Sequence, residues 1–352
     1  MNRCLTAAAL CLAVLVGSAS SAAAQDANFA GKTVNLTIGF AAGGGVDLYA
    51  RTVGRHIGGK LPGNPNIVPL NKPGAGGVVA LNEWSQTASK DGTSITVGAL
   101  SQTDPDSLRE TQARFNPADF KMVGGISAYS QGIFIRDDAK ARLTDRSAKP
   151  VVVGMVGSTL RGATYAILWG AQFLGWNVTF VPGYPGTGDV RQALERGEVE
   201  MATFGADRDF EYIKKNVKAT ILAQTGQVQD GKRVKRPVLD DAPIFSDLIG
   251  DKIKDPEAKK AYAYWEQVSQ VGMWLALPPG TPDNIVTAYV KAFEATNKDQ
   301  AFIDEYNKIS PGWLVAHKPD LEKQISELAK VTPETLKYID DAQKKVGLGG
   351  GK

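Results

Sequence analysis

Three consecutive glycines near the start of the chain, residues 43–45, separate a strand-like segment from a helix-like one. Apolar and polar residues alternate over residues 34–40, which is the period of a β-strand. Apolar residues then recur at helical spacing over residues 46–57. The first N–H groups of a helix have no acceptor within the helix, and a turn without Cβ atoms lets a ligand approach them closely. These residues therefore predict a site for an anion such as a carboxylate.

The sequence offers little that could carry out catalysis. Its two histidines, His56 and His317, have no Cys, His or Glu partner at the spacing of a metal site. A G-x-S-x-G segment, which would hold the nucleophile of many serine hydrolases, does not occur. Residues 54–60 match G-x-x-x-x-G-K, but Leu61 stands where a phosphate-binding loop has Ser or Thr. We therefore expect a binding protein without catalytic residues, metal or cofactor.

The first 25 residues have the pattern of an export signal. Arg3 precedes an apolar run over residues 5–16, and three alanines at residues 22–24 offer a cleavage site, so we assign residues 1–25 to a signal peptide. Both cysteines, Cys4 and Cys11, lie inside this segment, which leaves the exported chain without a disulfide or a thiolate ligand. We therefore expect a location outside the cytoplasm.

The charges of the chain do not indicate a nucleic-acid partner. The formal net charge is +3, and acidic and basic residues are interspersed. The densest basic run, residues 232–236, lies close to Asp240 and Asp241, which is typical of a solvated loop.

Strand-like and helix-like segments alternate along the chain, which predicts an α/β fold with largely parallel sheets. A glycine turn between a strand and a helix occurs in the first half at residues 43–45 and again in the second half at residues 183–189. We therefore expect two similar Rossmann-like α/β domains around a ligand cleft. Domain 1 would comprise residues 26–130 plus 265–352, and domain 2 residues 131–264. Two or more crossovers between them would allow hinge closure.

Six short segments resemble, in order, the motifs of the solute-binding receptors of tripartite tricarboxylate transporters, also called Bug receptors. The segments are residues 40–47 (FAAGGGVD), 71–77 (NKPGAGG), 90–93 (KDGT), 184–188 (YPGTG), 197–200 (GEVE) and 278–282 (PPGTP). The resemblance covers nearly the whole exported chain. It implies a periplasmic binding protein-like fold and a receptor that delivers an organic carboxylate to a transporter with a large and a small integral membrane subunit. We expect the receptor to be a monomer.

The resemblance also implies which residues bind the ligand. In the family, loops from the two domains hold the ligand carboxylate, and the carboxyl ends of parallel strands form the usual binding edge. The candidates that this gives are Ala42, Gly43, Gly44, Gly45, Val46, Asp47, Ser101, Gln102, Thr103, Ser158, Thr159, Tyr184, Pro185, Gly186, Thr187 and Asp189.

Several candidates also have a purely structural interpretation. Asp47 could be a helix N-cap that orders the first loop, and a bare carboxylate there would repel an anionic ligand. The polar side chains of residues 101–103 could be helix caps, and Tyr184 could pack beneath its loop. We expect Gly44 to have a positive φ that only glycine tolerates.

The identity of the ligand stays open, because the sequence departs from the family pattern near the expected site. Val46 replaces a common Thr or Ser, Ala42 a common Pro, and Glu200 an Asp.

One alternative function is that of a sensory binding protein, which presents its loaded form to a membrane kinase. Such a protein would need the same cleft. An exported hydrolase is a further alternative, which the missing nucleophile turn disfavours.

Overall fold

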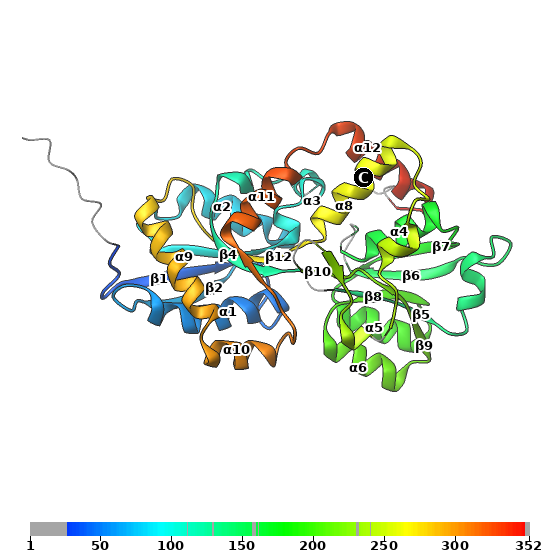
Figure 1. Ribbon diagram of the computed structural model, residues 1–352, viewed down its shortest axis with the longest axis horizontal. Coiled ribbons are helices and arrows are strands. Elements are labelled where there is room, and N and C mark those ends of the chain that lie inside the picture. The colour runs from blue at the N-terminus through cyan, green and yellow to red at the C-terminus, as the bar shows by residue number, and fades with distance from the viewer. Residues whose placement is uncertain are drawn as a thin grey trace, which may run out of the picture.

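The computed structural model describes residues 27–110, 112–128, 130–156, 160, 162–229, 232–239 and 241–348. Two sheets lie side by side along the long axis of the molecule (Figure 1). The expected signal peptide, with Cys4 and Cys11, lies outside the described residues, and so do Ser158 and Thr159.

The first sheet, within the described residues, has the strand order β13–β4–β12–β3–β1–β2. Its strands are β1 (Thr33–Ile38), β2 (Asn66–Asn71), β3 (Ser94–Ala99), β4 (Lys121–Ser127), β12 (Val271–Leu277) and β13 (Val315–His317). β1 is parallel to β2 and β3, whereas β12 runs antiparallel to β3 and β4, and β13 antiparallel to β4. The ends of β1 to β4 and the beginning of β12 therefore meet at one edge.

The second sheet, within the described residues, has the strand order β7–β6–β8–β5–β9. Its strands are β5 (Gly132–Arg136), β6 (Val151–Val156), β7 (Val178–Tyr184), β8 (Met201–Phe204) and β9 (Ala219–Gln224). β6 is parallel to β7 and β8, and β5 is antiparallel to β8 and β9. A separate hairpin, β10 (Gln227–Gln229) and β11 (Lys232–Val234), lies between the two sheets (Figure 1).

Helices cover both faces of each sheet. Their bounds are α1 (Gly45–Ile57), α2 (Val78–Thr87), α3 (Pro105–Glu110), α4 (Thr164–Phe173), α5 (Thr187–Arg196), α6 (Asp207–Asn216), α7 (Phe245–Ile249), α8 (Pro256–Val268), α9 (Asp283–Asn297), α10 (Gln300–Asn307), α11 (Lys318–Leu328) and α12 (Pro333–Lys345). α1, α9 and α10 bury an apolar cluster against one face of the first sheet, and α5 and α6 do so on one face of the second. Burial of such apolar surface is the main stabilising contribution in a protein of this kind.

A third apolar cluster is continuous between the two halves. It contains Trp84 of α2, Ile325 of α11, Trp265 of α8 and Trp169 of α4, all buried. α12 packs against α8 and α4, so the end of the chain returns to the second half (Figure 1). The expected domain boundary between residues 264 and 265 falls inside α8.

The expected α/β class is confirmed, but the sheets are mixed rather than largely parallel, because β5, β12 and β13 run against their neighbours. β4, β13 and the β10–β11 hairpin were not expected. In β4, Gly124 and Gly125 interrupt the apolar alternation. A Cβ at Gly124 would lie 2.2 Å from the ring of Phe293, so close packing of α9 requires glycine there.

Candidate functional site

The first glycine turn connects β1 to α1 and is exposed from Ala41 to Gly45. Gly43 has φ +83°, in the left-handed region that favours glycine. Gly44 is the N-cap of α1, with φ −78° and ψ 167°, which is extended backbone open to any residue. The expectation of a positive φ at Gly44 was therefore wrong, and the strained position is Gly43.

Asp47 orders this turn from within α1. Its carboxylate accepts hydrogen bonds from the Gly43 N–H at 2.8 Å, from Arg51 Nε at 2.9 and 3.0 Å, and from Asn71 Nδ2 at 2.8 Å. The Asn71 amide also donates to the Phe40 carbonyl at 2.9 Å and accepts from Arg51 Nη2 at 2.7 Å. The network links both ends of the turn to β2. Asp47 thus orders the loop, although it is not the N-cap, since Gly44 occupies that position.

The charge on Asp47 is neutralised inside the protein. Its side chain is 2% exposed. Burial by itself raises the pKa of this carboxyl, but the hydrogen bonds from Arg51, Gly43 and Asn71 outweigh burial and hold the pKa below its ordinary value. Asp47 is therefore ionised at neutral pH and paired with Arg51, so it presents no bare charge to an anion in front of the turn.

The turn leaves backbone donors free. Gly43 donates to Asp47, but the N–H groups of Gly44, Gly45 and Val46 have no acceptor among the described residues. They lie at the start of a helix, where the helix dipole also favours negative charge. Val46 is half-buried and packs against the apolar cluster below the turn. This arrangement can hold a carboxylate with backbone groups alone.

The polar side chains after β3 bond to the local backbone. Gln102 is fully buried and its Oε1 accepts from the Ala99 N–H at 2.8 Å. Thr103 Oγ1 donates to the Leu100 carbonyl at 3.0 Å, and Ser101 Oγ to the Gly76 carbonyl at 3.4 Å. These bonds fit the structural interpretation of the three side chains, and the bond from Ser101 ties the turn after β3 to the glycine-rich turn of residues 74–77, before α2.

The second candidate loop begins where β7 ends at Tyr184 and leads into α5. Gly186 is the N-cap of α5 and no side chain caps it, so this helix start also offers free N–H groups. Pro185, Thr187 and Asp189 are exposed, whereas Tyr184 is half-buried against the apolar cluster of the second sheet. Tyr184 therefore packs at least partly beneath its loop.

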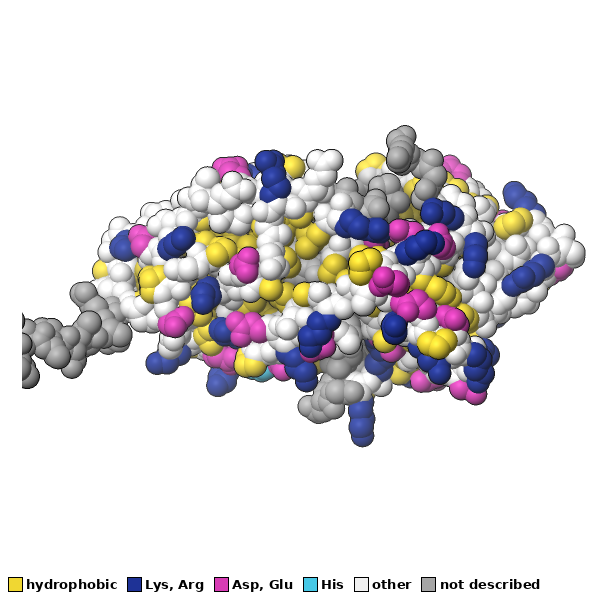
Figure 2. All heavy atoms as spheres, turned by 90° about the horizontal axis from the view of Figure 1, so that it is seen from above, with side chains coloured by type: hydrophobic (Ala, Val, Ile, Leu, Met, Phe, Trp, Pro, Cys, Tyr) yellow, Lys and Arg dark blue, Asp and Glu magenta, His cyan; other side chains and the backbone are white. Residues whose placement is uncertain are grey.

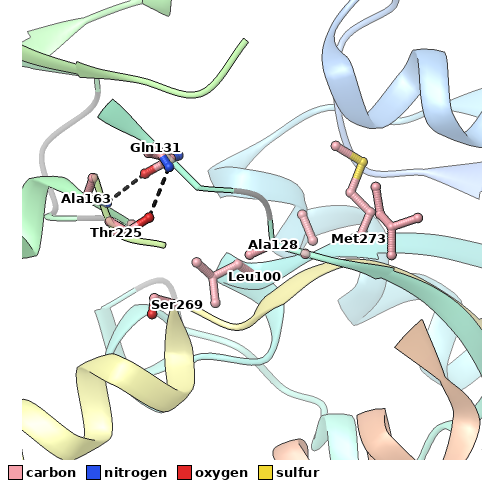
Figure 3. Close-up of a pocket in the computed structure, with 11 residues that line it drawn as sticks. Leu100, Ala128, Gln131, Ala163, Thr225, Ser269 and Met273 are labelled. Atoms are coloured by element: carbon pink, nitrogen blue, oxygen red, sulfur yellow. Dashed lines mark hydrogen bonds between the residues drawn. The ribbon is translucent and has the colours of Figure 1, made fainter. Parts of the chain in front are cut away.

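A pocket of about 160 Å³ opens between the two sheets (Figure 3). From the first sheet and the turn after β3 it is lined by Ala99, Leu100, Ile126, Gly272 and Met273. From the connecting segments and the second half it is lined by Ala128, Gln131, Gly162, Ala163, Thr225 and Ser269. The pocket thus lies where the chain crosses between the sheets, and both halves contribute walls.

Hydrogen bonds fix the wall from the second half. Gln131 Oε1 accepts from the Ala163 N–H at 2.7 Å, and the Gln131 N–H donates to Thr225 Oγ1 at 3.0 Å (Figure 3). The Trp265 indole donates to the Gly162 carbonyl at 2.9 Å. These bonds join three segments that are distant in sequence into one surface.

None of the pocket residues was among the candidates from the sequence. They belong to the same sheet edges, but several lie at the beginnings of antiparallel strands, such as Met273 in β12 and Gln131 before β5. The rule that ligands bind at the carboxyl ends of parallel strands does not predict residues at the beginnings of antiparallel strands. Thr225 directly follows the carboxyl end of β9, so the same rule could have identified it, but it was not among the candidates.

Other kinds of site are not evident in the part of the chain that the structure describes. That part contains no group of His, Cys, Asp and Glu residues able to hold a metal ion. Among the same residues no helix is both long and apolar enough to span a bilayer. Figure 2 shows acidic and basic side chains interspersed over one face, without a patch of a single sign.

The chain is similar to a curated protein and to several solved structures, among them a periplasmic binding protein. No family model matches the chain. A "UPF0065 protein in gbd 5'region" from Cupriavidus necator is 27% identical over 239 residues, which are 64% of this chain and 69% of that protein. The structure of the periplasmic binding protein BugD is similar with a TM-score of 0.61 and 21% identity, over 88% of this chain and 97% of that one. A protein from R. palustris, solved with adipate, gives a TM-score of 0.63 and 17% identity, over 90% and 98%.

The fold is therefore that of the periplasmic solute-binding proteins, with two α/β halves and a pocket between them. BugD, which shares this fold, carries the name of the receptor family that the motifs of residues 40–47 and 71–77 resemble.

Proposed function

We propose that this protein is a periplasmic receptor that captures an organic carboxylate between its two halves and delivers it to a membrane transporter of the tripartite tricarboxylate type, with a large and a small integral subunit. The proposed receptor works as a monomer, is exported by a cleaved signal peptide, and binds its ligand without changing it chemically.

The observation that carries the proposal is the exposed start of α1. Three consecutive N–H groups, of Gly44, Gly45 and Val46, lack an acceptor among the described residues, and the turn that presents them is fixed by Asp47. An ordered set of free donors at a helix N-terminus stabilises an anion. The pocket adjoins this turn, because a Cβ at Gly45 would lie 3.7 Å from Met273 Cε. The ligand can therefore place its carboxylate at the turn and its body in the pocket.

Closure is the proposed link between binding and delivery. We propose that the loop of residues 184–189 reaches the ligand from the opposite half when the halves approach each other. A ligand that touches both halves stabilises only the closed form, so binding shifts the population towards it. The apolar cluster shared through α8, α11 and α12 holds the halves together on one side, so closure would be a rotation about that side.

The test is a panel of C4–C6 dicarboxylates, citrate, acidic amino acids, aliphatic monocarboxylates and aromatic carboxylates, applied to the purified exported chain. At least one compound should raise the melting temperature, since saturation at a hundredfold excess over the dissociation constant adds about 2.7 kcal/mol of stability. The same compound should reduce the radius of gyration in solution scattering. If no compound of the panel binds, the receptor function is contradicted. If a compound binds without compaction, hinge closure is contradicted.

A further inference from the structure

We propose that the ligand is a monocarboxylate with an uncharged body of about six carbons, a ring or a short chain, rather than a di- or tricarboxylate. This inference rests on the proposed receptor function and names the chemical class that the same site accepts.

The chemistry of the pocket wall is the first argument. Among the described residues, its lining contains no acidic or basic side chain, and most of it is apolar. Ala99, Leu100, Ile126 and Met273 form the wall on the side of the first sheet. A second carboxylate placed there would leave water without a charged partner, and burying an unpaired charge is strongly unfavourable. Hydrocarbon, in contrast, gains from burial against these side chains.

Among the described residues, the guanidinium of Arg233 lies behind this wall, but its hydrogen bonds are in use. Arg233 donates to the Thr225 carbonyl at 2.8 Å, to the Glu266 carbonyl at 3.1 Å and to Ser269 Oγ at 3.1 Å. Its Nε also lies 3.4 Å from a carboxylate oxygen of Glu266. Arg233 therefore joins the turn after β9 to the end of α8, and its charge is paired with that of Glu266. A ligand carboxylate would have to displace these bonds to reach it.

The path from the turn to the pocket is the second argument. Met273 lines the pocket beside the first turn, because its Cε lies 3.7 Å from the position of a Cβ at Gly45. A ligand anchored at the N-terminus of α1 and extending into the pocket therefore passes beside the thioether. Methionine is flexible and contacts both aliphatic and aromatic groups favourably. An apolar body next to the carboxylate fits this passage.

The size of the pocket is the third argument. Its volume is about 160 Å³, and an apolar cavity of about 150 Å³ accepts one benzene ring. At the far side, Gln131 Nε2 has no acceptor among the described residues, and the Thr225 hydroxyl accepts from the Gln131 N–H and can still donate. These neutral donors suit a hydroxyl or carbonyl oxygen on the ligand body, which they can bind without a charge.

Two pairs of compounds test the inference by calorimetric titration of the exported chain. Hexanoate and adipate have the same six carbons, and benzoate and terephthalate share one ring, so each pair differs by one carboxylate. The monocarboxylate of at least one pair should bind about tenfold or more tightly than its partner. Tighter binding of adipate and terephthalate would overturn the inference and leave the receptor function standing. No binding by any carboxylate would contradict both.

A variant locates the binding in the pocket. Ala128→Leu adds three carbons to the wall and should weaken the preferred six-carbon monocarboxylate by about tenfold or more, because the body no longer fits. Acetate, which needs only the turn, should bind the variant and the unmodified protein equally. The control is Ala301→Leu, at an exposed position of α10, which should change neither. Unchanged binding of the six-carbon ligand by Ala128→Leu would place its body elsewhere and overturn the inference.

Discussion

Gly43 and Gly44 are neighbours in the proposed carboxylate turn, yet the structure predicts different results when each is changed to alanine. Gly43 has φ +83°, and an alanine in this left-handed region costs about 1–2 kcal/mol. Its N–H must stay directed at Asp47 to keep the turn in place. Gly44 has φ −78°, and its added Cβ would lie 3.5 Å from the Ala41 carbonyl, which is an ordinary contact. Gly44→Ala therefore leaves the backbone unstrained and adds only bulk in front of the helix start.

For Gly43→Ala, we expect the strain to be divided between folding and binding. The loss of unfolding free energy and the loss of binding free energy should together reach about 1–2 kcal/mol, which corresponds to a combined factor of roughly 5 to 30. For Gly44→Ala, we expect unfolding to change by no more than about 1 kcal/mol, the difference between Gly and Ala at an N-cap. Its ligand affinity should nevertheless fall by about tenfold or more, since the methyl group blocks close approach.

Urea unfolding and calorimetric titration of both variants measure these two quantities. The control is Gly31→Ala, because Gly31 also has a positive φ of +71° and free space around its Cβ, but lies outside the turn. It should lose stability and keep full affinity. Wild-type affinity in Gly44→Ala would show that no ligand approaches the turn, and the carboxylate assignment would be lost.

Three further predictions concern charge and redox. Asp47→Asn should weaken ligand binding, because it releases the turn. If Asp47 instead presented a bare charge to the ligand, its neutralisation would tighten binding. Calorimetric titration of the variant decides between these two outcomes. The same variant should cost about 2 kcal/mol of unfolding free energy at neutral pH, the scale of a charge-assisted hydrogen bond. Since the pKa of Asp47 is lowered from 3.8 in the folded protein, its contribution is complete well above that value and is lost as the pH falls through the lowered pKa. The difference in unfolding free energy between the two proteins, measured with urea, should therefore shrink as the pH falls below 3.8. A chain that begins at residue 26 contains no cysteine, so its melting temperature should be the same with and without reductant.

The sequence predicts the strands and helices that carry a regular apolar period. The apolar runs of residues 201–204 and 271–277 form β8 and β12, and α1 follows the glycine turn as its spacing requires. β4 was not predicted, because Gly124 and Gly125 interrupt its apolar pattern. Both positions need glycine because neighbouring elements pack closely against them, and this packing cannot be seen in the local sequence. The antiparallel orientation of β12 could not be predicted either, because strand direction depends on the path of the whole chain.

Within the candidate site, the part that is local in sequence is the part that could be predicted. The first turn, and the pairing of Asp47 with Arg51 four residues later, follow from helical spacing. The bond from Asn71 to Asp47 depends on the register of β1 and β2. The pocket joins Leu100, Thr225 and Met273, which only the complete fold brings together. Sequence reasoning therefore finds the donors for an anion and misses the wall that selects the rest of the ligand.

The central claim is that the site binds a carboxylate through backbone N–H groups at the start of α1, which favour a negatively charged group. Calorimetric titration with a carboxylate that raises the melting temperature, and then with the amide of the same acid, tests it most directly. The account predicts a saturable heat for the acid, and for the amide an affinity lower by about tenfold or more, because a neutral group gains little from the helix N-terminus. Equal affinities for the acid and its amide would contradict the account.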